Sequence, residues 1–139
     1  MRSTKSETNP NACNQNDQKV NIGETGKRYD LEDRTAAFAE RVRDFVKKPP
    51  KDLTNQEYAR QLVRSSGSVG ANYIEANESL SRKDFLMRIK ISRKEAKESR
   101  FWLRLIVPTE GEAQQRLRLI QEATELMMIF GAIVRKVAA

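Results

Sequence analysis

The stretch from Ser81 to Val107 constrains the fold more than any other part of the chain. Apolar and small residues recur in it at alternating steps of four and three, which is typical of a helix that buries one side. These positions are Phe85, Ile89, Ser92, Ala96, Ser99, Leu103 and Ile106. The same stretch carries nine Lys/Arg residues against three acids, a net charge of +6 in a chain whose total is +7. One segment is therefore expected to supply part of the core and most of the excess charge.

Three further segments show helical spacing. Pro49 and Pro50 end the first of them, because proline fixes φ and lacks an N–H donor. Pro108 and Gly111 separate the last two. We expect helices at about residues 30–47, 55–78, 82–107 and 110–137 of one domain, 29–139. Short links make consecutive helices antiparallel neighbours, so the predicted fold is all-α, an antiparallel up-and-down four-helix bundle.

Local signals refine the first two links. Thr54 and Glu57 have capping-box spacing and predict that the second helix starts at Thr54, and Ser81 is the predicted cap of the third helix. Gly67 and Gly70 lie inside the second helix without a break in its spacing, so we expect a continuous helix that another backbone approaches closely. The predicted buried positions of the other helices are Leu31, Phe38, Val42, Phe45; Ala59, Leu62, Ser66, Val69, Tyr73, Ala76, Leu80; and Ile120, Ala123, Met127, Phe130, Val134, Val137.

The N-terminal residues 1–28 are polar and predict a disordered tail. They lack the apolar core of a signal peptide, and no apolar run approaches the roughly 18–20 residues that span a bilayer. We therefore expect a cytoplasmic protein. Cys13 is the only cysteine, which excludes an intramolecular disulfide.

Most cations of residues 81–107 fall on one side of the predicted helix. At about 100° per residue, eight of the nine occupy an arc of roughly 120° beside the buried positions. This basic stripe comprises Arg82, Lys83, Lys90, Arg93, Lys94, Lys97, Arg100 and Arg104, and leaves out Arg88. One reading is a solvated face whose lysines meet acids on neighbouring helices. The other is a nucleic-acid-binding surface, because clustered charge of one sign suits phosphate backbones.

The opposite flank of the same helix is partly apolar. It carries Met87, Ile91 and Trp102, with Phe101 and Leu105 continuing towards the back. The three acids Asp84, Glu95 and Glu98 lie among them. Because the helix already has its buried row, a second apolar face predicts a subunit interface.

The sequence gives little support to catalysis. Glu75 with Glu78 and Glu95 with Glu98 have the i, i+3 spacing of metal sites in bundles, but the chain has no histidine. The glycines Gly67 and Gly70 lack the Lys-Ser/Thr that a phosphate-binding loop needs. We expect a protein that is not an enzyme and has no catalytic residues, metal site or cofactor.

Three blocks resemble a known family. The run 61–77, QLVRSSGSVGANYIEAN, resembles the "RS…S.GAN..EA" block of the bacterial four-helix bundle proteins encoded in intervening sequences of 23S ribosomal RNA genes. The run 81–85, SRKDF, resembles the "S.KDF" helix start of that family. The run 94–103, KEAKESRFWL, resembles its "KEA.ES..WL" block. The order and spacing agree over about residues 30–137.

The resemblance implies a ring-like homopentamer of four-helix bundles. It also implies kinship with the basic accessory protein of diversity-generating retroelements, which works with nucleic acid and a reverse transcriptase. No binding residue is carried over from either relative.

Two functions from different classes follow from the sequence. The leading hypothesis is a homopentameric protein that binds RNA, or else DNA, by charge and shape through the basic stripe. The alternative is a protein-interaction scaffold whose semi-apolar flank binds a polypeptide such as a reverse transcriptase.

Overall fold

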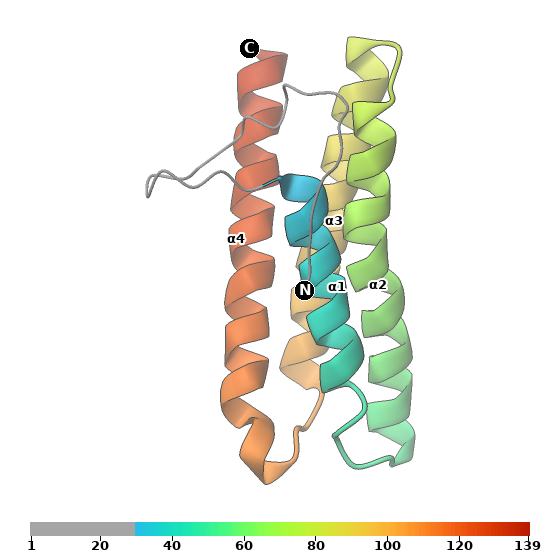
Figure 1. The fold of residues 1–139 in the computed structure, drawn as a ribbon, viewed down its shortest axis with the longest axis vertical. Coiled ribbons are helices and arrows are strands. Elements are labelled where there is room, and N and C mark those ends of the chain that lie inside the picture. Colours follow the sequence, from blue (N-terminus) through green and yellow to red (C-terminus); the bar gives the residue numbers. More distant parts are fainter. Residues whose placement is uncertain (1–29) are drawn as a thin grey trace.

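The computed structural model describes residues 30–139, which form four helices and one short turn of 3-10 helix. These elements are α1 (Leu31–Phe45), α2 (Leu53–Asn77), α3 (Arg82–Leu105), η3 (Glu110–Glu112) and α4 (Ala113–Ala138). Successive helices run in opposite directions (Figure 1). The predicted all-α up-and-down bundle is therefore confirmed, whereas the predicted tail, 1–28, and Cys13 lie outside the described residues.

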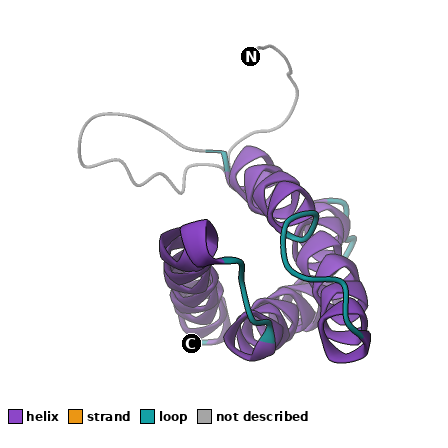
Figure 2. Cartoon of the chain, turned by 90° about the horizontal axis from the view of Figure 1, so that it is seen from below, coloured by secondary structure: helices purple, strands orange, loops and turns teal. Residues whose placement is uncertain are grey.

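The helices are arranged around a common core (Figure 2). α3 packs against α2 on one side and α4 on the other, while α1 packs on α2 and makes fewer contacts with α4. No helix among residues 30–139 is both long and apolar enough to cross a membrane.

α1, α2 and α3 each begin after a residue whose side chain caps the helix. The Asp30 carboxylate accepts a hydrogen bond from the backbone N–H of Glu32 at 3.0 Å, and Ser81 Oγ accepts one from Asp84 at 3.0 Å, which confirms the predicted cap of α3. The predicted start of α2 at Thr54 is wrong. Asp52 is the cap and accepts from the N–H of Asn55 at 2.9 Å, because an ionised carboxylate there also interacts favourably with the helix dipole.

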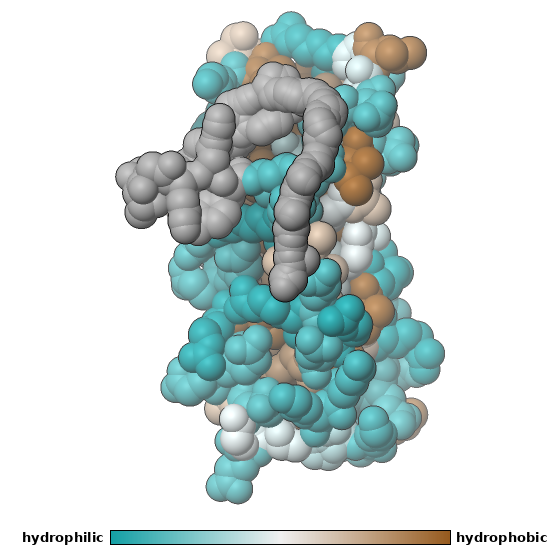
Figure 3. Space-filling model, viewed as in Figure 1, coloured by the Kyte–Doolittle hydropathy of each residue, from teal (hydrophilic) through white to brown (hydrophobic). Residues whose placement is uncertain are grey.

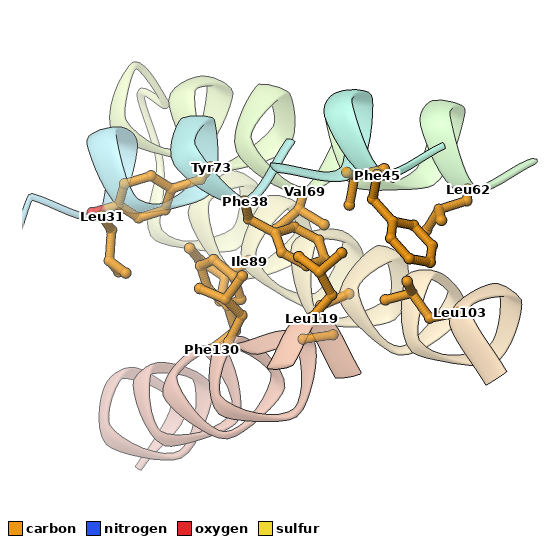
Figure 4. Close-up of a cluster of buried hydrophobic side chains, with 14 of the residues drawn as sticks. Leu31, Phe38, Phe45, Leu62, Val69, Tyr73, Ile89, Leu103, Leu119 and Phe130 are labelled. Carbon is orange, nitrogen blue, oxygen red and sulfur yellow. The ribbon is translucent and has the colours of Figure 1, made fainter. Parts of the chain in front are cut away.

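All four helices contribute to one hydrophobic core. Figure 4 shows Phe38, Val69, Ile89 and Leu119 meeting from α1, α2, α3 and α4. The predicted row on α3 is confirmed, since every member is buried except Phe85, which is partly buried. The predicted α2 row fails at Leu80, which is 98% exposed in the link to α3.

The predicted buried row of α4 is only partly correct. Leu119 and Leu126 are fully buried and were not predicted, whereas Ile120 and Met127 pack only partly against the core. Both rows share Ala123 and Phe130, which are buried. Adjacent rows lie only 100° apart on the helix, so spacing alone did not identify the centre of the buried face.

Small residues bring α2 close to its neighbours. Ser65 Oγ lies 2.8 Å from Ser99 Oγ, and Ser92 Oγ donates to the carbonyl of Val69 at 2.9 Å. On the α1 side, a Cβ atom added to Gly70 would lie 2.7 Å from Thr35 Oγ1. The predicted continuous helix is confirmed, and the predicted close approach occurs at Gly70.

We expect Gly70→Ala to destabilise the protein by about 1–3 kcal/mol, because the new methyl group overlaps the Thr35 side chain. Gly67→Ala is the matched control. Its added Cβ would meet no atom within 4 Å, so it should stabilise α2 by up to about 1 kcal/mol through helix propensity. Urea unfolding of both variants tests this contrast, and equal shifts of the two midpoints would contradict it.

Candidate nucleic-acid interface

A groove between α3 and α4 collects five cations and no acid. Its lining includes Lys90, Arg93, Lys94 and Lys97 from α3 and Arg135 from α4. The rest of the lining is apolar and consists of Met127, Met128, Gly131 and Ala132. The volume of the groove is about 960 Å³. The groove is therefore a concave basic surface, and we refer to its apolar α4 residues, Met127, Met128, Gly131 and Ala132, as its floor.

Gly131 lies where two guanidinium groups approach the floor. A Cβ atom on this glycine would be 3.5 Å from Arg135 Nη1 and 3.6 Å from Arg93 Nη1. Two cations from different helices therefore approach the same point of α4. With no carboxylate in the lining, this arrangement favours an anion in the groove.

Two of the three acids of α3, Glu95 and Glu98, are directed away from the groove, towards α2. Arg64 Nη2 lies 3.3 Å from the carboxylate of Glu95 and 2.7 Å from that of Glu98. Burial acts to lower the pKa of Arg64, but the charges and hydrogen bonds of the two carboxylates outweigh it and raise the pKa. Glu95 is buried, so its charge is held inside the α2–α3 contact.

The acids of α4 are directed towards α1. Arg34 of α1 donates to Glu122 at 2.7 Å and to Glu125 at 2.8 Å. The hydrogen bond to Glu122 is the largest cause of the raised pKa of Arg34. A hydrogen bond from Gln121 and then one from Arg34 lower the pKa of Glu125. Both helices that line the groove thus have carboxylates engaged on the far side.

No salt bridge within residues 30–139 involves any of the nine cations of α3. Three of them make neutral contacts instead. Arg82 donates to the carbonyl of Val137 at 2.7 Å, Arg88 to Asn72 Oδ1 at 2.8 Å, and Arg100 to Thr124 Oγ1 at 3.4 Å. The reading in which acids on neighbouring helices neutralise the basic stripe is thus not supported by these contacts.

The structure brings together only part of the predicted binding set. Lys90, Arg93, Lys94 and Lys97 line the groove, whereas Arg82, Lys83, Arg100 and Arg104 do not. Arg82 binds a carbonyl of the last turn of α4, which is a favourable position for a cation.

Sequence reasoning missed the contribution of α4. Met128, Gly131 and Arg135 recur at steps of three and four, so they share one face of the helix. This spacing was a usable signal. The spacing predicts the groove face only when the buried row of α4 is known to run through Leu119 and Leu126, because the groove face lies beside that row.

The semi-apolar flank of α3 is half exposed. Met87, Phe101 and Leu105 have exposed fractions of 47%, 49% and 36%. Trp102 differs, because it stacks on Tyr58 of α2 with ring centroids 5.9 Å apart and also meets the Phe101 ring edge-on at 5.0 Å. Its buried Nε1 has no hydrogen-bond partner among the described residues. Trp102 and the partly buried Ile91 are therefore less available to a second subunit than the other three.

No group of three or more Cys, Asp, Glu or His side chains in the range 30–139 is arranged to hold a metal ion.

We expect Arg64→Met to destabilise the fold by about 1–3 kcal/mol, because it leaves Glu95 as a buried carboxylate without its cation. Adding Glu95→Gln to this variant should recover most of the loss, since a neutral amide costs less to bury than a charge. A double-mutant cycle on thermal or urea unfolding measures the coupling. Strictly additive losses would show that Arg64 does not balance this charge.

Comparison with known proteins tests the resemblance seen in the sequence. Residues 27–131 match the family described as 23S rRNA-intervening sequence protein. No curated protein matches. A solved structure from Bacteroides thetaiotaomicron VPI-5482, described as a protein with unknown function from the S23 ribosomal protein family, is 31% identical, with a TM-score of 0.63. The match covers 75% of this chain and 97% of that one. The inferred resemblance is thus confirmed, and the chain belongs to the family of 23S rRNA-intervening sequence proteins.

Proposed function

We propose that this protein binds nucleic acid, RNA in preference to DNA, and catalyses no reaction. The observation that carries the proposal is the groove between α3 and α4, with its five cations and no acid. The preference for RNA is supported by the name of the family, which refers to sequences that interrupt 23S rRNA.

The electrostatics of the bundle support this function. The chain has a net charge of +7, and the carboxylates nearest in sequence to the groove cations are held by Arg64 and Arg34 on the far sides of α3 and α4. A polyanion in the groove therefore meets cations without like charges among them. Binding releases counterions from the phosphates, so the affinity should fall as salt is raised.

We also propose that the protein is a homo-oligomer, a pentamer by its family resemblance, and that the exposed part of the semi-apolar flank forms the contact. Met87, Phe101 and Leu105 offer apolar surface on the same helix as the groove cations. Several subunits would multiply the basic surface and strengthen its field. A polypeptide partner such as a reverse transcriptase would use this same flank in the alternative function.

We expect the triple variant Lys90→Gln, Lys94→Gln, Lys97→Gln to bind RNA at least about tenfold more weakly than the wild type. Its plot of log affinity against log salt should be shallower by about 2, because each lost phosphate contact removes roughly 0.7 from the slope for a single strand. Mobility shifts at 50–200 mM salt measure both quantities.

A matched control removes the same number of positive charges from another part of the surface. Lys47→Gln, Lys48→Gln, Lys51→Gln removes three exposed lysines near the link between α1 and α2. This control should lose much less affinity. Equal losses in the two triple variants, or wild-type binding that is absent or insensitive to salt, would contradict the proposed function.

We expect light scattering to give a wild-type mass several times that of the 16.0 kDa chain, and Phe101→Ser to lower it by weakening the subunit contact. Val63→Ser is the control, because this α2 side chain is exposed to the same 49%. A wild-type mass of one chain, or dissociation by the Val63 variant alone, would contradict the proposed interface.

A further inference from the structure

The floor of the groove carries a feature that phosphate binding alone does not require. Met127, Met128 and Ala132 offer apolar surface directly beside the cations, and Met128 is 66% exposed. Phosphates interact with cations and gain nothing from a thioether. A ligand that matches the whole groove therefore has a charged backbone and flat apolar groups attached to it.

We propose that the groove binds a single-stranded segment of RNA, with phosphates along the α3 cations and unpaired bases against the methionine floor. This inference rests on the proposed function and specifies its ligand. Thioethers make favourable contacts with aromatic rings, and guanidinium planes such as those of Arg93 and Arg135 stack on bases. The two arginines over Gly131 are placed for this role.

The apolar part of the lining favours one strand over two. In a duplex the bases are paired and stacked, so they present only their edges in the grooves and cannot place their faces against Met127 or Met128. The bases of a single strand are free to make this contact while its phosphates lie on the cations.

The lining also indicates which RNA sequences would be accepted. It holds no Asn, Gln, Asp or Glu, so its lysines and arginines are the only side chains able to read base edges, and the proposal places them on phosphates and base faces. Contacts to base faces are tolerant of sequence. We therefore expect weak sequence preference and a clear preference for unpaired over paired strands.

The test uses the full chain and three fluorescent probes in anisotropy titrations at one salt concentration. The probes are a 12-nucleotide oligouridine, a 12-base-pair RNA duplex, and a 12-nucleotide abasic strand with the same phosphates. We expect the wild type to bind the oligouridine at least about tenfold more tightly than the abasic strand, and more tightly than the duplex.

Met128→Ser should lower the affinity for oligouridine by about fivefold or more and leave that for the abasic strand unchanged. Its salt slope should equal that of the wild type, because no charge is removed. Leu53→Ser, which alters an exposed apolar side chain at the start of α2, is the matched control and should have no effect. Met128 is exposed, so the variant is expected to fold, which circular dichroism checks.

The outcomes separate this inference from the proposed function. Equal binding of oligouridine and the abasic strand, or tighter binding of the duplex, overturns the inference. The proposed function would still stand in that case if the triple variant of Lys90, Lys94 and Lys97 binds RNA more weakly than the wild type. A wild-type protein that binds none of the three probes overturns both.

Discussion

The basic groove depends on how two arginines outside it engage the carboxylates of its walls. Arg64 of α2 binds Glu95 and Glu98 of α3, and Arg34 of α1 binds Glu122 and Glu125 of α4. These contacts join α3 to α2 and α4 to α1. They also hold negative charge on the far sides of the two helices, so the α3–α4 contact keeps its cations uncompensated. The same ion pairs therefore support the fold and shape its electrostatic field.

Much of α3 could be predicted from its sequence, because the helical period fixes the relative directions of side chains on one helix. The buried row through Ile89 and Leu103 followed from spacing, as did the position of Lys90 and Lys97 beside it. Tertiary packing, by contrast, determines which residues of α4 face the flank that carries Lys90 and Lys97. The α4 half of the groove was missed because two adjacent rows, through Leu119 and through Ile120, fit the apolar pattern of α4 about equally well. Kinship with the retroelement accessory protein and the number of subunits stay predictions.

Two local errors have the same origin. Thr54 and Asp52 both lie at the start of α2 with suitable side chains, and the choice between them depends on where the link from Pro50 places the first turn. Asn55 helps to fix that link, since its side chain donates to the carbonyl of Pro50 at 3.1 Å and to that of Val107 at 3.1 Å. Glu95 was predicted on the semi-apolar flank and is buried at the α2–α3 contact, where Arg64, 31 positions earlier, donates to its carboxylate. Contacts between distant residues decided both cases.

The division of α3 into flanks allows two kinds of contact at once. Lys90, Arg93 and Lys97 are committed to the groove with α4, whereas Met87 and Leu105 belong to the other exposed flank. The space-filling view shows that the α1 face is mostly hydrophilic, with separate hydrophobic patches towards the α2 side (Figure 3). Subunits that met through Met87 and Leu105 would leave the α4 side of each groove open. Oligomerisation would then add binding sites rather than cover them, and linked sites bind a long polyanion more tightly than one site does.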